Sequence, residues 1–415
     1  MERSASVSTS FPVLTPRPAR PGLALAAISI ALLLAMTTWF SATAVLPQLR
    51  TEWGVSDLTG SLLTIAVQLG FVAGSLIAAA FNLPDIVPPR RLMLYGAGIA
   101  AAANAVLLLA DGPALAVPLR FVTGIGLAGV YPPALKALAT WYRSGRGAAL
   151  GAITAAVTLG SATPHLINGI GGVDWHLVVA LTSALTLIGG VLAALIPEGP
   201  YPFPRGVFDP RQIRATIANR GVRLASLGYF GHMWELYAMW AWFSAFILAV
   251  LNERGWSEPG RSASLMTFAV IGVGAIGCIV VGLIADRWRR PLIINYSLAV
   301  SGACALIIGL LVHAPVPLIL GVGLVWGFAV VADSAQFSTL VTEHADQRFV
   351  GTALTLQLAV GFALTVTTIW LIPFARDLVG WRWAFALLGV GPAVGIAAML
   401  RLSAADELKS ARLES

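Results

Sequence analysis

Apolar residues occur in long runs that are separated by short polar or charged segments throughout the chain. Most runs are about 20 residues long, which is enough for an α-helix to cross the hydrocarbon core of a bilayer. Because a chain inside a bilayer must bond its own backbone groups, these runs predict helices and an all-α membrane protein. The twelve helices that we expect span residues 23–46, 58–81, 92–110, 114–138, 147–171, 175–196, 221–251, 262–284, 291–312, 316–340, 349–373 and 381–402.

Two charged loops lie at equivalent places in this pattern and suggest that the chain consists of two similar halves. Their charged residues are Asp85, Arg90 and Arg91 in the first loop, and Asp286, Arg287, Arg289 and Arg290 in the second. Asp85 and Asp286 are 201 positions apart, and Arg146 and Arg348, before the fifth and eleventh helices, are 202 apart. A near-constant offset between separate landmarks favours a duplicated six-helix unit.

Polar segments set the expected boundaries of the two halves. The stretch between the sixth and seventh helices contains five prolines and four arginines, which is typical of a linker. We therefore expect an N-terminal tail at 1–22, a first six-helix half at 23–196, a linker at 197–220, a second half at 221–402 and a C-terminal tail at 403–415.

The composition agrees with a protein embedded in a membrane. The chain is 58% hydrophobic and 11% charged, whereas a soluble domain carries about 25% charged residues. Its net charge of +7 requires no nucleic-acid partner, because Lys and Arg gather on the cytoplasmic side of a membrane protein. With both termini in the cytoplasm, 20 of the 26 Lys and Arg residues lie on that side and five lie outside. We expect a multi-pass protein of the inner (cell) membrane.

Residue types that bind metals or cofactors form no motif in this sequence. Cys278 and Cys304 lie inside apolar runs, and the five histidines are scattered along the chain. There is no nucleotide-binding loop and no nucleophile motif. The sequence therefore predicts no cofactor, no metal site, no enzyme activity and no use of ATP.

The chain resembles the major facilitator superfamily from its first to its twelfth expected helix. The family's loop motif, Gly-x-Leu-x-Asp-Arg-x-Gly-Arg-Arg, is matched in the second half by Gly282, Asp286, Arg287, Arg289 and Arg290. Ile284 stands at the leucine position, and the second glycine of the motif is missing. The copy in the first half keeps the aspartate and two arginines but has Asn82 near the first glycine position.

Two shorter matches extend the resemblance. Arg120, Gly124 and Gly126 match the family's fourth-helix pattern, Arg-x-x-x-Gly-x-Gly. Residues 129–133 and the pair 146–147 are similar to bacterial members near the cyanate and nitroimidazole transporter group. The resemblance implies that the two charged loops act as gates and that Arg120 takes part in proton coupling. It also implies that helices two, five, eight and eleven form the interfaces between the halves.

Two acidic residues, Glu235 and Asp333, fall well inside the expected helices. Ionisable groups in a bilayer are costly and usually face a polar cavity or a partner. Glu235 lies near the middle of the seventh helix, about one turn after His232, and burial disfavours the charged form of a carboxyl group. The pair is a candidate proton site; the alternative is a packing hydrogen bond between the two side chains.

Asp333 lies in the tenth helix, nearer the cytoplasm, on one helix face with Trp326 and Gln336. Two roles remain open for this acid. It can line the central cavity, or it can pair with Arg287 or Arg289 and latch a gate.

Arg120 lies near the outer third of the fourth helix. In hydrocarbon its guanidinium must pair with an acid, a helix carbonyl or an anionic substrate. The alternative is that its head group snorkels to the outer interface, which its depth permits.

Further polar and aromatic side chains inside the expected helices are candidates for lining a substrate cavity. The seventh helix holds more aromatic residues than packing requires, although each candidate alone can also be explained as packing. The candidates are Trp39, Gln68, Tyr131, His165, Trp234, Tyr237, Gln336 and Gln357.

These features predict a secondary active transporter that moves a small solute by rocking two halves around a midplane site. Protons are the expected coupling ion. The alternatives are a facilitative uniporter or an anion exchanger and, from a different class, a membrane receptor or scaffold that transports nothing. The expected partners are the solute, protons and membrane lipid, and the expected state is a monomer.

Overall fold

The protein is described by a computed structural model that covers residues 20–81, 83–142, 146–172, 174–201, 213–285, 287–346 and 350–414. Within these residues twelve helices are long and apolar enough to cross a membrane, and no strand occurs. The predicted fold class, an all-α membrane protein of two six-helix halves, is therefore confirmed. The spans are Pro21–Thr38, Asp57–Ala80, Pro89–Leu109, Pro113–Ala139, Gly147–Ile170, Trp175–Leu195, Arg220–Glu253, Pro259–Ala285, Arg290–Leu311, Val316–His344, Val350–Val379 and Trp381–Glu407.

The helices of the first half run from α1 to α10, and several spans consist of more than one element. They are α1 (Pro21–Ala35), η1 (Met36–Thr38), α2 (Ser41–Ala44), α3 (Leu46–Trp53), α4 (Asp57–Ala80), α5 (Leu83–Ile86), α6 (Pro89–Val106), η2 (Leu107–Leu109), α7 (Pro113–Ala128), α8 (Tyr131–Ala139), α9 (Arg146–Ile170) and α10 (Trp175–Leu195).

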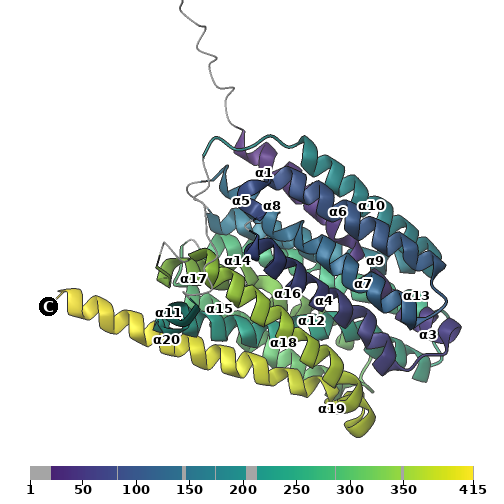
Figure 1. Ribbon diagram of the computed structural model, residues 1–415. Coiled ribbons are helices and arrows are strands. Elements are labelled where there is room, and N and C mark those ends of the chain that lie inside the picture. The colour runs from purple at the N-terminus through teal and green to yellow at the C-terminus, as the bar shows by residue number, and fades with distance from the viewer. Residues whose placement is uncertain are drawn as a thin grey trace, which may run out of the picture.

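The second half follows after a short helix, α11 (Ile213–Ala218), which lies within the stretch expected to be a linker. Its elements are α12 (Arg220–Glu253), α13 (Pro259–Gly272), α14 (Gly274–Ala285), α15 (Arg290–Ile307), η4 (Ile308–Leu311), α16 (Val316–Ala332), α17 (Ser334–His344), α18 (Val350–Val379), α19 (Trp381–Ala384), η5 (Phe385–Gly389) and α20 (Val390–Glu414). In Figure 1, α10 and α20 lie on opposite sides of the bundle.

The first span is broken, which corrects the prediction of one continuous helix over 23–46. Helix α1 ends at Ala35, a 3-10 turn follows, and Trp39 and Phe40 form a turn before α2 begins. Hydroxyl side chains in this stretch bond backbone carbonyls, as Ser41 does with Thr38 at 3.0 Å. Such bonds compete with the backbone hydrogen bonds of the helix. The Arg120 side chain donates hydrogen bonds to the carbonyl groups that the break leaves without a helical partner.

The fourth and tenth spans are interrupted at equivalent positions. Helix α7 ends at Ala128 and α8 begins at Tyr131, whereas α16 ends at Ala332 and α17 begins at Ser334. The starts of α8 and α17 are 203 positions apart, close to the offsets of 201 and 202 between the charged landmarks. The sequence repeat is thus also a repeat of backbone breaks, and it places Asp333 at an interruption of its helix.

The halves meet along two pairs of spans. Helix α4 packs against α18, and α9 packs against α13 and α14, so helices two, five, eight and eleven form the interfaces as the resemblance implied. A Cβ atom added at Gly151 of α9 would lie 2.6 Å from the Cys278 carbonyl oxygen of α14. Small residues permit this backbone approach.

Polar contacts join the halves at one end of the bundle, which we call the distal end and define by Asp57, Asn168 and Arg376. Figure 1 shows α3 and α19 at this end, opposite the C-terminus. Asp57 of α4 is 6% exposed and pairs with Arg50 of α3 and with Arg376 of α18. Asn168 of α9 donates to the Ser264 hydroxyl of α13 at 2.8 Å. The two halves are therefore closed against each other at the distal end.

Candidate functional site

Glu235 lies in the interior of the second half, with a side chain that is 1% exposed. Its Oε1 accepts a hydrogen bond from Trp326 Nε1 of α16 at 2.6 Å, and its Oε2 accepts one from Ser301 Oγ of α15 at 2.9 Å. Both donors are neutral groups. The carboxyl group is thus satisfied as a hydrogen-bond acceptor without a Lys or Arg partner.

His232, about one turn before Glu235 on α12, faces a different acid. Its Nδ1 lies 2.9 Å from Oδ1 of Asp333, and both side chains are 1% exposed. The imidazole also packs against the rings of Tyr229 and Phe337, with centroid distances of 6.0 and 5.4 Å. The predicted pairing of His232 with Glu235 is therefore wrong, because the helix directs the two side chains to different positions on α16 and α17.

The contacts of Asp333 bear on one of its two predicted roles, the latch to Arg287 or Arg289. Its carboxyl group is buried beside His232, whereas Arg287 is exposed and Arg289 binds Glu407 at 2.7 Å. The predicted latch between Asp333 and the arginine loop is therefore wrong. Asp333 belongs to the buried polar groups of the second half.

Arg120 is fully buried in the first half, where oxygen atoms surround its guanidinium. It donates to the carbonyls of Thr38 at 2.9 Å and Trp39 at 2.5 Å, within the break of the first span. It also donates to Asn104 Oδ1 at 2.8 Å, Ser41 Oγ at 3.1 Å and the Leu63 carbonyl at 3.4 Å. The helix-carbonyl alternative is thus the one observed, and the snorkelling alternative is wrong.

Aromatic rings from both halves meet near the centre of the bundle. We call Trp39, Phe40, Phe71, Tyr237, Trp240 and Phe362 the aromatic cluster. The Trp39 ring lies 4.9 Å from that of Phe71, 5.6 Å from that of Phe362 and 5.8 Å from that of Tyr237. These rings come from the first, second, seventh and eleventh spans, so the cluster bridges the two halves.

Several of the predicted cavity residues are buried without a hydrogen-bond partner. Both amide atoms of Gln68, Gln336 and Gln357 are unpaired, and so are both ring nitrogens of His165. Each of these side chains is at most 1% exposed. Buried polar atoms are normally bonded, so helix packing alone does not account for these side chains.

The other predicted cavity residues differ in their surroundings. Tyr131 is half-buried and packs against the main hydrophobic core. Trp234 instead donates its indole N–H to the Leu387 carbonyl at 3.1 Å and packs near Gly391 of α20. The structure therefore places Trp234 against the twelfth span.

The predicted gating loops lie at the end of the bundle opposite the distal end. Asp286 and the side chain of Asp85 lie outside the described residues. Arg90, Arg91 and Arg287 are exposed. The ion pairs of Arg289 and Arg290 tie the second loop to α20 and α17.

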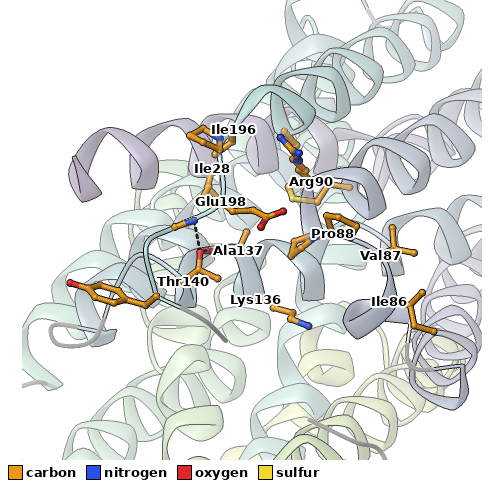
Figure 2. A pocket seen from close by; sticks show the side chains of 16 residues that line it. Ile28, Ile86, Val87, Pro88, Arg90, Lys136, Ala137, Thr140, Ile196 and Glu198 are labelled. Carbon is orange, nitrogen blue, oxygen red and sulfur yellow. Dashed lines mark hydrogen bonds between the residues drawn. The ribbon is translucent and has the colours of Figure 1, made fainter. Parts of the chain in front are cut away.

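A cavity of about 300 Å³ opens beside the first of these loops. Figure 2 shows the Glu198 carboxylate among Pro88, Ala137 and Arg90, and a bond from the Gly199 N–H to the Thr140 hydroxyl, which measures 3.0 Å. None of the buried acids or unpaired amides lines this cavity. We therefore assign the candidate site to the buried groups of the interior, where the ionisable side chains are.

Sequence reasoning missed the partners of the buried charges. Ser41 and Asn104 bind Arg120, and Ser301 binds Glu235. A small polar residue within an apolar run is a weak signal, because it is also common in ordinary helix packing. Only the rotation of each helix within the bundle shows which charge it faces.

Among the described residues, twelve membrane-length helices in two halves, with ionisable groups buried within their spans, define a polytopic membrane protein of the transporter class. The chain belongs to the Major Facilitator Superfamily, whose sequence profile matches residues 28–368. It is thus a membrane transporter and not an enzyme.

Named relatives agree with this class. The chain is 22% identical over 353 residues to the gallate transporter of Pseudomonas putida, covering 76% of each chain. Its fold is similar to that of a bacterial homologue of the human lysosomal transporter Spinster, solved in an inward-facing, occupied conformation. The TM-score is 0.68 and the sequence identity is 17%, and the match covers 94% of this chain and 98% of the other. It is also similar to the human organic anion transporter MFSD10, with a TM-score of 0.67, 15% identity and coverage of 92% and 100%.

Proposed function

We propose that this transporter moves a small solute across the inner membrane by alternating access, that it is coupled to protons, and that both termini are cytoplasmic. The observation that carries the proposal is Glu235, a carboxyl group buried in a membrane span among neutral hydrogen-bond donors. A charged carboxylate is costly in such surroundings. The group is therefore suited to take up a proton in one conformation and to release it in another.

The partners of Glu235 can serve both protonation states. The Ser301 hydroxyl lies 2.9 Å from Glu235 Oε2 and 3.3 Å from the Leu298 carbonyl oxygen. A hydroxyl has one proton and can rotate. It can donate to the ionised carboxylate, or donate to Leu298 and accept from the protonated acid. This adaptability supports a titrating role over a fixed packing role.

His232 and Asp333 form a second buried acid–base pair, at the break of the tenth span. A helix interruption supplies backbone groups that can move without breaking a continuous ladder. We propose that this pair responds to the same conformational change as Glu235. Arg120, in contrast, supports the broken first span and makes no bond to an acid among the described residues.

The contacts at the distal end support alternating access. The ion pair between Asp57 and Arg376 joins the halves there, and so does the bond between Asn168 and Ser264. These bonds are specific and few, so a rocking motion of the halves can exchange them for contacts at the opposite end. The gating role of the arginine loops at that opposite end stays part of the proposal.

The test compares two transport modes of Glu235→Gln in proteoliposomes, with radiolabelled gallate as the first solute. Gln keeps the shape and hydrogen bonding of Glu but carries no titratable proton. We expect counterflow to persist and accumulation driven by a pH gradient to be lost. Glu253→Gln, at the exposed end of the same helix, is the matched control and should accumulate solute as the parent does.

If Glu235→Gln concentrates the solute as well as the parent, Glu235 is a packing residue and Asp333 is tested next. A parent protein that equilibrates the solute but never responds to a pH gradient would instead be a facilitative uniporter. Stimulation of uptake only by an anion on the opposite side would identify an exchanger.

A further inference from the structure

We propose that the solute is a planar aromatic molecule with hydrogen-bonding substituents, bound at the aromatic cluster and the three unpaired carboxamides without a permanently charged partner from the protein. This inference rests on the proposed transport function and assigns the chemical class of its substrate. The observations that carry it are the rings of the aromatic cluster, the unpaired atoms of Gln68, Gln336 and Gln357, and the contacts of Arg120.

The aromatic cluster offers ring faces and edges from both halves. Trp39 and Phe71 come from the first half, whereas Tyr237 and Phe362 come from the second, and their rings are tilted by 34° to 58° rather than stacked. Aromatic rings prefer tilted, offset or edge-on neighbours. A planar ring that entered between the halves would find such partners on each side.

The unpaired carboxamides lie on α4, α17 and α18, of which α18 packs against α4 and both α17 and α18 pack against α12. Gln68 precedes Phe71 by three residues on α4, so both lie on one helix face. Gln357 precedes Gly361 by four residues on α18, at the face where an added Cβ would meet the Tyr229 ring of α12 at 2.3 Å. Gln336 lies one turn after Asp333 on α17. Three spans that pack around α12 or its neighbour α18 therefore each carry a buried, unpaired amide group.

Carboxamides that lack a partner are unfavourable in a core that serves packing alone. An amide has two donors and two acceptor sites, and burying it unpaired costs free energy. The indole N–H groups of Trp39 and Trp240 in the aromatic cluster are also unpaired. Donors and acceptors beside aromatic rings match a small aromatic molecule with hydroxyl or carbonyl groups.

The distribution of charge argues against recognition by a fixed cation. Arg120 is the one Lys or Arg side chain that is buried among the described residues, and its guanidinium already donates to five oxygen atoms of the protein. A carboxylate on the solute would have to compete with these oxygen atoms for the guanidinium. We therefore infer that binding depends mainly on the ring and its neutral substituents.

The test measures binding of three probes to the purified full-length protein in detergent by isothermal titration calorimetry. Gallate carries the ring, the hydroxyl groups and a carboxylate; methyl gallate keeps the ring and hydroxyls without the charge; cyclohexanecarboxylate has a carboxylate without the ring. We expect methyl gallate to bind at least as tightly as gallate and cyclohexanecarboxylate not to bind. Preference for cyclohexanecarboxylate, loss of binding on esterification, or binding of none of the three would overturn the inference.

Two variants separate binding from folding. Gln357→Met should weaken methyl gallate binding about tenfold, because a good hydrogen bond is lost, and should raise the melting temperature, because an unpaired amide is removed. Phe362→Leu should weaken binding, whereas Phe374→Leu, at an exposed position of the same helix, should not. Unchanged affinity in both Gln357→Met and Phe362→Leu would contradict the site.

These outcomes are distinct from those that test proton coupling. Loss of the pH-driven step in Glu235→Gln with unchanged probe preference would support both proposals. A transporter that is proton-coupled but prefers a non-aromatic acid would keep the proposed function and overturn the substrate class.

Discussion

Arg120 shows how a charged side chain can serve the structure of a membrane protein rather than its substrate. Its planar guanidinium bonds two carbonyls of the broken first span and three further oxygen atoms at once. No other side chain offers five donors in a fixed plane. The break in the first span and the arginine in the fourth therefore depend on each other.

We predict that Arg120→Ala destabilises the protein by at least about 3 kcal/mol, because it leaves the Thr38 and Trp39 carbonyls unpaired. Arg120→Lys should recover only part of this loss, and both variants should transport poorly. Thermal unfolding in detergent, compared with Arg91→Ala at an exposed position, measures the effect. A melting temperature for Arg120→Ala equal to that of the parent would contradict the structural role.

At the residue scale the sequence identified the buried groups but not their partners. Glu235 and Asp333 stand out because acids are rare in apolar runs. Ser301, which binds Glu235, was not singled out, and His232 was placed beside Glu235 instead of Asp333. Helical spacing places residues on a face without saying which helix that face meets. The pairing of Asp57 with Arg376 spans 319 positions, and no local pattern connects the two.

At the scale of helices, the paired spans of the two halves depend on close backbone contact. Helices α9 and α14 approach at Gly151, where any side chain would press on the backbone carbonyl of Cys278. A contact with backbone is hard to relieve by a rotamer change. The motion that we propose for the halves requires these helices to move past each other at this contact.

We predict that Gly151→Ala slows transport and lowers the melting temperature. Gly98→Ala on α6 is the control, because a Cβ there has no neighbour within 4 Å, and it should be neutral or stabilise by about 0.5–1 kcal/mol. Initial uptake rates and thermal unfolding measure both. Equal rates for the two alanine variants would refute a tight interface at Gly151.

Helix positions followed closely from the sequence, whereas breaks within helices did not. The second span was expected at 58–81 and is Asp57–Ala80. The eleventh span was expected to end at residue 373 and ends at Val379. Hydropathy reports where apolar residues begin and end. The turn at Trp39 and Phe40 contains neither Pro nor Gly, and it forms because tertiary hydrogen bonds replace those of the helix.

At the scale of the whole molecule, the distal end holds the two halves together through a nearly buried ion pair. Asp57 is 6% exposed and bridges Arg50 of its own half with Arg376 of the other. Arg376 also binds Asp377, but that aspartate is 67% exposed and belongs to the same helix. Of the two ion pairs of Arg376, only the pair with Asp57 joins the two halves and can resist their separation.

We predict that Asp57→Asn shifts the protein toward conformations that are open at the distal end, whereas Asp377→Asn leaves the equilibrium unchanged. Spin labels attached through Thr51→Cys and Leu378→Cys, both at exposed positions, report the distance between the halves. Pulsed electron resonance should show longer distances in Asp57→Asn. Identical distance distributions for the parent and both variants would mean that this ion pair does not hold the distal end closed.

The central claim is that Glu235 carries the proton that drives solute movement. The most direct measurement records the lumenal pH of proteoliposomes, with an enclosed pH-sensitive dye, while gallate or methyl gallate is added outside and its uptake is followed in parallel. We predict solute-driven proton movement in the parent and in Glu253→Gln, and solute exchange without proton movement in Glu235→Gln. Solute entry without any proton movement in the parent, or undiminished proton movement in Glu235→Gln, would contradict it.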